Sequence, residues 1–335
     1  MSGQKANYRI YGAELSPYSV KVRSYFRYKN IPHEWIVRDR SRMEEFQRYA
    51  KLPLIPLVVT PEGDGLQDST PIIDKMEALY AAPPIHPSDP ALGFLSALIE
   101  EYADEWVNKP MFHYRWLRDV DQMSAAGRLA KMALPKADAP ELEAAAAAIR
   151  ERMVSRLSFV GSSPETADQI EASFKRLIDL VERHLGDRDY LFGGRPAFAD
   201  FGLYAQLYEM WSDPTPGALI KESCPRLVRW IERMLDPPRG GGDFESWDRL
   251  APTLAPILSQ EIAGLFLPWS VANARALEAG KAEFSVELEG QTFTQATQKY
   301  HARSLKALRE RYQSVLDKTA LDPILKKTTC LEWLG

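Results

Sequence analysis

The sequence predicts an α/β amino-terminal part, then an all-helical part, then a mainly helical carboxyl-terminal region that contains a small hairpin. Three observations support this order. The first 80 or so residues alternate short strand-like runs with helix starts, residues 88–236 carry helical apolar spacing, and apolar and polar residues alternate from position 282 to 290. A chain of 335 residues can bury more than one core, so we expect at least two domains.

The first strand is predicted at residues 8–11, where aromatic and β-branched side chains precede a glycine. Ser16 and Pro17 then mark a helix start, because serine is a favoured N-cap and proline fits the first helical position. This helix is predicted to run to about Lys29. Ser16 therefore stands where a strand passes into a helix, and its hydroxyl can either cap that helix or bind an anion there.

A second strand is predicted at residues 34–37, and a second helix within residues 38–49. Residues 54–59 form an apolar run interrupted by Pro56, which belongs at a strand start or edge because proline cannot donate to a ladder. A glycine-rich turn at 63–65 leads to the last strand of this part. Asp68 and Ser69 then precede a third helix that ends near Tyr80.

The prolines of residues 81–87 predict a linker. Helices are expected from there to about residue 235, with a bend near Pro110 in the first of them. Residues 250–279 predict one or two further helices, residues 282–293 a hairpin, and residues 296–316 a basic helix. The predicted parts are thus 1–81, 88–236 and 243–335, and the last of them is expected to be folded and packed on the helical part.

Composition limits the classes of function. The chain has 42 Lys and Arg against 46 Asp and Glu, a net charge of −4, so no basic surface for nucleic acid is expected. We expect no apolar run in the sequence to span a bilayer, and residues 1–7 lack the apolar core of a signal peptide, so we expect no membrane partner. The two cysteines have neither metal nor redox spacing, which predicts no metal site and a reducing, cytoplasmic compartment.

The order of Ser16-Pro17, Pro56 and Asp68-Ser69 resembles the cytosolic glutathione transferase superfamily, in its serine-type form. The resemblance covers roughly the first 235 residues. It implies a thioredoxin-like amino-terminal domain, an all-helical second domain and glutathione as cosubstrate, and it leaves a homodimer open. The stretch 193–203, which contains Asp200, resembles the buried helix start of the family's second domain. This implies a structural role for the Asp200 carboxylate.

The resemblance also implies a role for each residue of a glutathione site. Ser69, at a helix N-terminus, would bind the γ-glutamyl carboxylate, and Asp68 would accept from the ammonium group. A cis Pro56 would turn the backbone of Ile55 toward the cysteinyl peptide. Ser16 would donate a hydrogen bond to the sulfur, which stabilises the thiolate and lowers the pKa of the thiol.

One departure concerns the glycyl end of glutathione. The family often has Gly-Lys where this chain has Pro53-Leu54, so a cationic contact would have to come from Lys51 or Arg42. Ser16-Pro-Tyr-Ser19 also mimics the Cys-Pro-Tyr-Cys of glutaredoxins, but disulfide exchange needs a thiolate, which argues against an oxidoreductase.

The second substrate, an electrophilic small molecule, is expected between the two domains. Tyr18, Trp106, Tyr114 and Arg115 are the residues predicted for this pocket, on the strength of an aromatic-rich stretch at 105–116. Taken singly, each candidate also has a purely structural explanation: Ser16 and Ser69 as helix caps, Pro56 as an edge-strand proline, and the aromatic residues as core side chains. Three functions therefore stay open: a glutathione transferase, a non-catalytic glutathione or ligand binder, and a protein-interaction module of the same fold.

Overall fold

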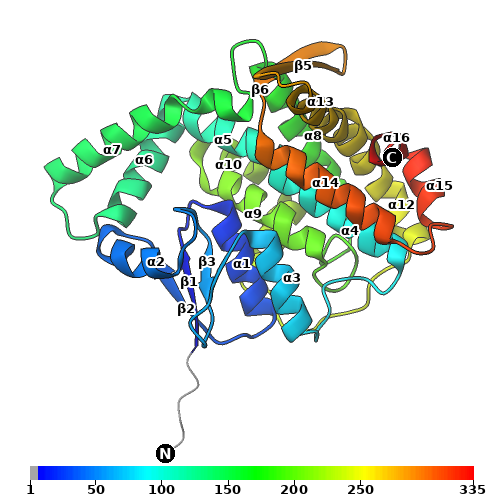
Figure 1. Cartoon of the computed structure of the whole chain (residues 1–335), viewed down its shortest axis with the longest axis horizontal. Helices are drawn as coiled ribbons and strands as arrows, with labels where there is room; N and C mark the ends of the chain where they lie inside the picture. The colour runs from blue at the N-terminus through cyan, green and yellow to red at the C-terminus, as the bar shows by residue number, and fades with distance from the viewer. Residues whose placement is uncertain (1–6) are drawn as a thin grey trace, which may run out of the picture.

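The computed structural model describes residues 7–335, so the first six residues of the predicted first domain, and almost all of the stretch examined for a signal peptide, lie outside it. The amino-terminal part has the predicted alternation of strands and helices (Figure 1). Its elements are β1 (Tyr8–Gly12), α1 (Pro17–Tyr28), β2 (His33–Val37), the 3-10 turn η1 (Arg40–Arg42), α2 (Met43–Tyr49), β3 (Leu57–Val59), β4 (Gly65–Gln67) and α3 (Ser69–Leu79).

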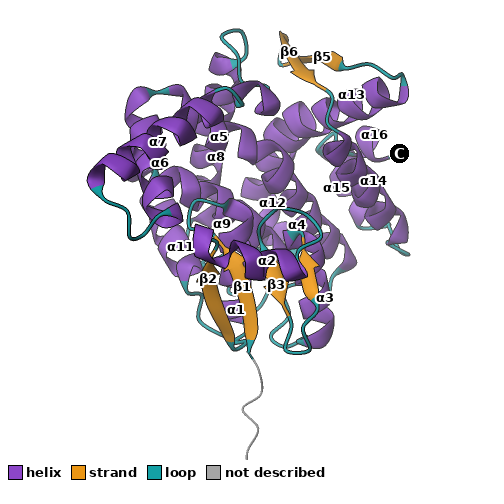
Figure 2. Cartoon of the chain, turned by 60° about the vertical axis from the view of Figure 1, so that its left-hand side comes forward, coloured by secondary structure: helices purple, strands orange, loops and turns teal. Residues whose placement is uncertain are grey.

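The four strands form one sheet in the order β2-β1-β3-β4, with β1 and β2 parallel and the other pairs antiparallel. Successive side chains along each strand point to opposite faces of this sheet. Ile10 and Val58 face the core that also holds α1 and α3, whereas Tyr11 and Leu57 pack with Phe46 of α2 on the other face. Figure 2 shows α2 in front of the strands. This is a thioredoxin-like domain, as the resemblance implied.

A helical lobe follows. Its elements are α4 (Pro90–Tyr102), the π turn η2 (Ala103–Val107), α5 (Asn108–Leu117), α6 (Asp119–Ala133), α7 (Ala139–Val154), the 3-10 turn η3 (Leu157–Val160), α8 (Ala167–Leu185), α9 (Phe198–Ser212), α10 (Pro214–Ser223) and α11 (Pro225–Leu235). The irregular point expected at Pro110 lies upstream, at η2. Proline lacks an N–H and crowds the carbonyl four residues before it, which here is the carbonyl of Trp106 in η2. The wider π turn directly before α5 accommodates this crowding.

Asp200 has the structural role that its position implied. Its carboxylate accepts hydrogen bonds from the backbone N–H of Leu191 (2.9 Å) and of Ala197 (2.8 Å), and from Trp230 Nε1 (2.9 Å). All three donor residues are buried. Since they belong to the start of α9, to the loop before it and to α11, the carboxylate joins these three segments in the core.

The carboxyl-terminal extension is folded and packed on the helical lobe, as predicted. It comprises α12 (Trp247–Pro256), the π-helical η4 (Ile257–Phe266), α13 (Leu267–Glu278), the hairpin β5 (Glu283–Leu288) and β6 (Gln291–Ala296), α14 (Lys299–Ser314), α15 (Leu321–Lys327) and α16 (Leu331–Leu334). Buried contacts tie it down: Tyr102 Oη donates to Glu261 Oε2 at 2.9 Å, and Trp106 stacks edge-on against Trp269. The last two helices were not predicted. The boundaries 1–81, 88–236 and 243–335 stay a proposal.

Within the described residues, one continuous helix, Trp247–Glu278, is long and apolar enough to cross a membrane by length and composition alone. This helix corrects the expectation that no apolar run in the chain reaches spanning length. Leu254, Ile262 and Phe266 are buried inside the fold, and a core helix passes the same test, so the helix is weak support for a membrane span.

Candidate functional site

A cleft of about 750 Å³ opens between the loop before β3, the start of α3 and the side of α14. Four of the residues predicted to bind glutathione line it together: Ile55, Pro56, Asp68 and Ser69. The Ile55–Pro56 peptide is cis, as the resemblance implied. Residues of the loop, of β4 and of α3 are thus brought to one surface by the antiparallel pairing of β3 with β4.

Asp68 is held in an uncommon backbone conformation at the mouth of this cleft. Its φ of 75° lies in the region that residues other than glycine rarely adopt, and such outliers cluster at functional sites. Its side chain makes no capping hydrogen bond to α3. Instead, Asp68 Oδ2 accepts from Tyr300 Oη of α14 at 3.2 Å, so the carboxylate faces the cleft.

Gln67 fixes the loop that forms one wall of the cleft, a role that sequence reasoning missed. Its amide oxygen accepts from the backbone N–H of Lys51 (2.8 Å) and Leu52 (2.9 Å), and its amide nitrogen donates to the carbonyls of Leu52 (2.8 Å) and Leu54 (2.7 Å). All hydrogen-bonding capacity of the amide is used. Lys51 lines the cleft, whereas Arg42 pairs with Glu45 at 3.3 Å, so of the two proposed cations only Lys51 is in place.

Beneath Ser69 lies a buried ionic network that the sequence did not reveal. Lys21 Nζ of α1, fully buried, donates to Asp104 Oδ2 at 2.6 Å, to Thr70 Oγ1 at 3.1 Å and to Ser69 Oγ at 3.4 Å, and it also pairs with Glu100. Burial by itself lowers the pKa of Lys21, but the two carboxylates outweigh it and hold that pKa above its usual value. The ammonium is therefore charged at neutral pH and ties α1 to α3 and to η2.

Asp104 is one of the two acidic partners of Lys21 in this network. Burial raises the pKa of Asp104 to about 7, although the Lys21 charge opposes the shift. Its second oxygen, Oδ1, is buried without a hydrogen-bond partner among residues 7–335. Because the partners of Lys21 lie 79 and 83 residues away in the chain, no local pattern could have identified them.

Ser16 caps α1, as predicted. Its Oγ accepts from Ser19 N at 3.3 Å and from Ser19 Oγ at 2.9 Å. Both contacts use Ser16 as acceptor, so its own proton is available to another acceptor. The residues that line the cleft do not include Ser16, but they include Tyr18, two residues further along the chain, whose Oη donates to the carbonyl of Asp104 at 3.1 Å.

The structure corrects the other three residues assigned to a second-substrate pocket, because none of them lines this cleft. Trp106 and Tyr114 are each 1% exposed, packed against Trp269 and Phe174 respectively. Arg115 is 3% exposed, and its guanidinium is neutralised by two buried carboxylates, those of Glu209 (2.7 Å) and Asp213 (2.6 Å). Their side chains are structural, because aromatic content in a sequence does not distinguish a core from a pocket.

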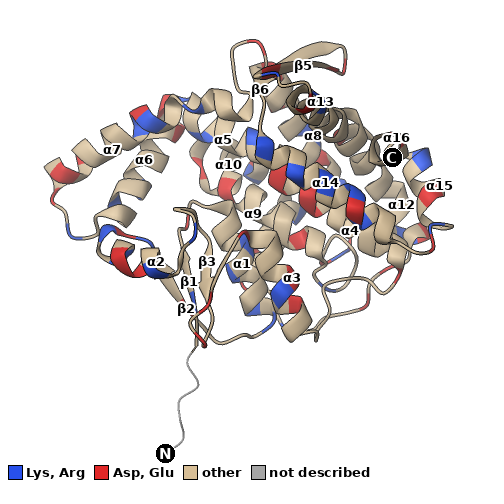
Figure 3. Ribbon diagram, viewed as in Figure 1, with Lys and Arg blue, Asp and Glu red and all other residues tan. Residues whose placement is uncertain are grey.

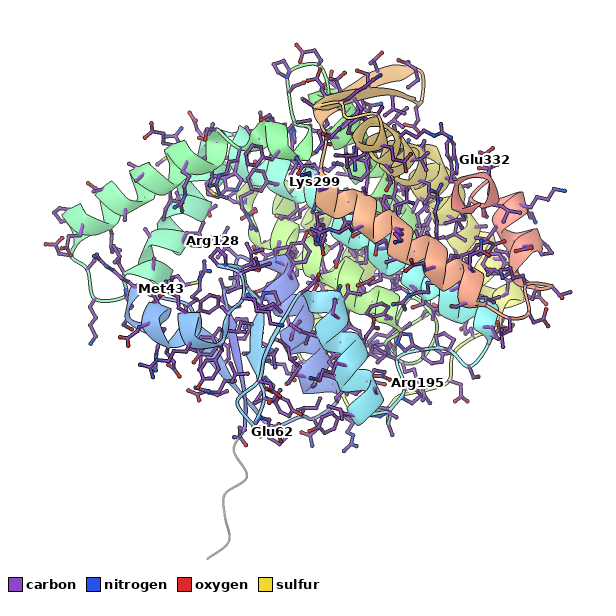
Figure 4. All side chains as sticks on the ribbon, in the orientation of Figure 1. Met43, Glu62, Arg128, Arg195, Lys299 and Glu332 are labelled. Carbon is purple, nitrogen blue, oxygen red and sulfur yellow. The ribbon has the colours of Figure 1, made fainter. Side chains whose placement is uncertain are left out.

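Among the described residues, no group of three His, Cys, Asp or Glu side chains could hold a metal ion. Figure 4 labels Lys299, the first residue of α14, which in that view lies above the sheet domain. The site is thus built of backbone groups, hydroxyls, one carboxylate and several cations.

Two family models match the chain. The glutathione S-transferase N-terminal domain matches residues 10–84, and the glutathione S-transferase C-terminal domain matches residues 164–233. With the thioredoxin-like sheet and the helical lobe already described, these matches define the class of protein: the chain belongs to the glutathione transferase superfamily. Both models end before the extension.

Individual proteins of known function or structure are similar to the chain at 25% sequence identity or less. The isoprene-epoxide–glutathione S-transferase of Rhodococcus sp. (strain AD45) is 25% identical over 231 residues, which are 66% of this chain and 92% of that protein. The beta-etherase LigF of Sphingobium sp. strain SYK-6 has a TM-score of 0.50 at 19% identity, over 70% of this chain and 96% of the other. A glutathione S-transferase of Methylobacterium radiotolerans, solved with glutathione sulfonate, has a TM-score of 0.43 at 22% identity, over 72% of this chain and 99% of the other.

Proposed function

We propose that the protein is a glutathione transferase that binds glutathione in the cleft beside α3 and activates its thiol to attack an electrophilic small molecule. The observation that carries this proposal is the meeting of Ile55, Pro56, Asp68 and Ser69 in one cleft. The name of the Rhodococcus relative, an epoxide–glutathione transferase, supports an electrophilic substrate.

Each charged group of glutathione has a chemically suitable partner in this cleft. Ser69 is the first residue of α3, where free backbone N–H groups and the helix dipole favour the γ-glutamyl carboxylate. The Asp68 carboxylate suits the ammonium, and Lys51 suits the glycyl carboxylate. The backbone of Ile55, turned by the cis peptide, would pair with the cysteinyl amide.

Ser16 is the proposed catalytic residue. A hydroxyl that donates to sulfur stabilises the thiolate relative to the thiol and so lowers the pKa of the bound thiol. Since Ser19 supplies both of the hydrogen bonds that Ser16 Oγ accepts, the Ser16 proton is free for this role. Tyr18 would border the electrophile, because it lies on α1, the helix that Ser16 caps, and lines the cleft.

The proposal extends to setting and partners. Both cysteines, Cys224 and Cys330, are unpaired and buried, which is consistent with a reducing cytoplasm. The expected partners are glutathione and a small-molecule electrophile rather than nucleic acid or a membrane, and a homodimer stays open. One observation favours the alternative of a non-catalytic binder: Ser16 is not among the residues that line the cleft.

Calorimetric titration with reduced glutathione, followed by a conjugation assay with several electrophiles, tests the proposal. We expect saturable binding and turnover. Binding without turnover of any electrophile would favour the non-catalytic alternative. Absence of binding at millimolar glutathione would exclude both and leave a protein-interaction module of this fold.

A further inference from the structure

The extension helix α14 forms one wall of the cleft. Tyr300 and Arg303 line it together with residues of α3 and of the loop before β3. The two side chains are three positions apart and therefore lie on one face of the helix. Figure 1 shows α14 crossing in front of α4, above α1 and α3, so a segment far along the chain reaches the candidate glutathione site.

Contacts from residues between and beyond Tyr300 and Arg303 hold this wall in place. The His301 ring hydrogen-bonds through Nδ1 to the carboxylate of Glu105 of η2, and Ser304 Oγ donates to the same carboxylate at 3.2 Å. Further along the helix, Arg311 pairs with Asp74 of α3 at 3.2 Å. The helix is thus docked on both domains, and the positions of its cleft-facing residues are set by the fold.

The charges in the cleft are unbalanced. Three cations line it, Lys51, Lys75 and Arg303, against a single carboxylate, that of Asp68. Figure 3 shows both signs of charge along α14. Within the part of the chain that the structure describes, Arg303 forms no ion pair. Its guanidinium instead lies 5.8 Å from the centre of the Tyr300 ring, an arrangement that orients the planar group.

We propose that Arg303 binds an acidic group, such as a carboxylate, on the electrophile, so that the enzyme selects acidic substrates. This inference rests on the proposed function, because Ser69, Asp68 and Lys51 already suit the three charged groups of glutathione. A guanidinium binds a carboxylate through two parallel hydrogen bonds, and the apolar surface of Leu54 and Pro71 in the same cleft suits the rest of such a molecule.

Binding of ready-made conjugates tests this without requiring turnover. Calorimetry would compare S-(para-carboxybenzyl)glutathione, its methyl ester and glutathione itself on the wild type, on Arg303→Ala and on Lys75→Ala. Lys75 is the matched control, a cation that lines the same cleft from α3. For Arg303→Ala we expect the affinity for the carboxylate conjugate to fall about 10–100-fold, with less than about a 2-fold change for the ester and for glutathione.

The other outcomes overturn the proposal in distinguishable ways. An equal loss for conjugate, ester and glutathione would make Arg303 a glutathione contact. An equal loss of the carboxylate conjugate in Lys75→Ala would reflect the general charge of the cleft rather than Arg303. An unchanged carboxylate conjugate would remove any role for Arg303. A wild type that binds no glutathione would instead overturn the proposed function, and this inference with it.

Discussion

Lys21 Nζ lies 2.6 Å from Asp104 Oδ2, and this buried ion pair joins the first helix of the sheet domain to the π turn of the helical lobe. The same ammonium reaches Ser69 Oγ at 3.4 Å, at the first residue of α3. The residue proposed to bind the γ-glutamyl carboxylate is therefore positioned by a charge that sits between the domains. Stability and ligand binding should be coupled at this point.

Lys21→Met should destabilise the protein by about 3–5 kcal/mol, because it leaves the Asp104 and Glu100 carboxylates buried without a cation. It should also weaken glutathione binding, since Ser69 loses a partner. Urea denaturation and calorimetry would measure the two effects. Lys29→Met is the matched control. Lys29 is a buried lysine at the C-cap of the same helix, α1, and it pairs with Glu77 at 2.7 Å. It should cost stability and leave glutathione affinity unchanged; equal losses of affinity in both variants would contradict the coupling.

Ser69→Ala should weaken glutathione binding by about 1–3 kcal/mol, through the loss of one charge-assisted hydrogen bond to a carboxylate. The control is Thr70→Ala. Thr70 Oγ1 belongs to the same network, donating to Glu100 at 2.5 Å, but Thr70 is not among the residues that line the cleft. If calorimetry gave the same loss for both variants, the effect would come from the network rather than from contact with glutathione.

His184 should make stability depend on pH where the extension meets the helical lobe. Its ring nitrogens bond to Thr253 Oγ1 of α12 at 2.8 Å and to the Leu191 carbonyl at 2.7 Å. Burial lowers the pKa of His184 to about 4, with Arg188 acting in the same direction and Glu245 against it. The unfolded chain binds this proton more readily, so the stability contribution is present above pH about 6.5 and is lost as pH falls toward 4.

His184→Gln removes this titration, and the measurement is the difference between the two proteins. Urea denaturation of the wild type and the variant from pH about 7.5 to 4.5 should show the wild type losing stability more steeply as the pH falls. Comparison within the pair cancels the other buried groups that titrate in this range. Parallel pH profiles would mean that His184 does not titrate on unfolding.

Local signals in the sequence were enough to predict the sheet domain and part of the site. Ser16-Pro17 and Asp68-Ser69 are helix starts set by neighbouring residues, and the effect of Pro56 on its own peptide is equally local. The Lys21 network and the α14 wall depend instead on residues that only the folded chain brings together. Trp106 was misassigned for a related reason, since its burial against Trp269 depends on a helix more than a hundred and fifty residues away.

Ser16→Ala should raise the pKa of the thiol of bound glutathione and leave glutathione affinity largely intact. The affinity is attributed to Ile55, Asp68 and Ser69, whereas Ser16 would act on the charged sulfur. Ultraviolet difference titration of the bound thiolate measures that pKa directly. The conjugation rate should fall about 10-fold for each unit by which this pKa rises, less any gain in intrinsic nucleophilicity of the sulfur.

Loss of the helix cap must be separated from loss of the hydroxyl at this position, because an N-cap substitution alone costs about 1 kcal/mol of stability. Ser16→Thr keeps both the cap and the hydroxyl, so it should restore the thiolate and most of the rate. Ser19→Ala keeps Ser16 but removes the hydroxyl that donates to it at 2.9 Å, which makes Ser16 a weaker donor and should give a smaller shift in the same direction. If Ser16→Ala kept both the thiolate pKa and the rate, Ser16 would be a cap only, and Tyr18, whose hydroxyl lies at the cleft, would be the next group to substitute.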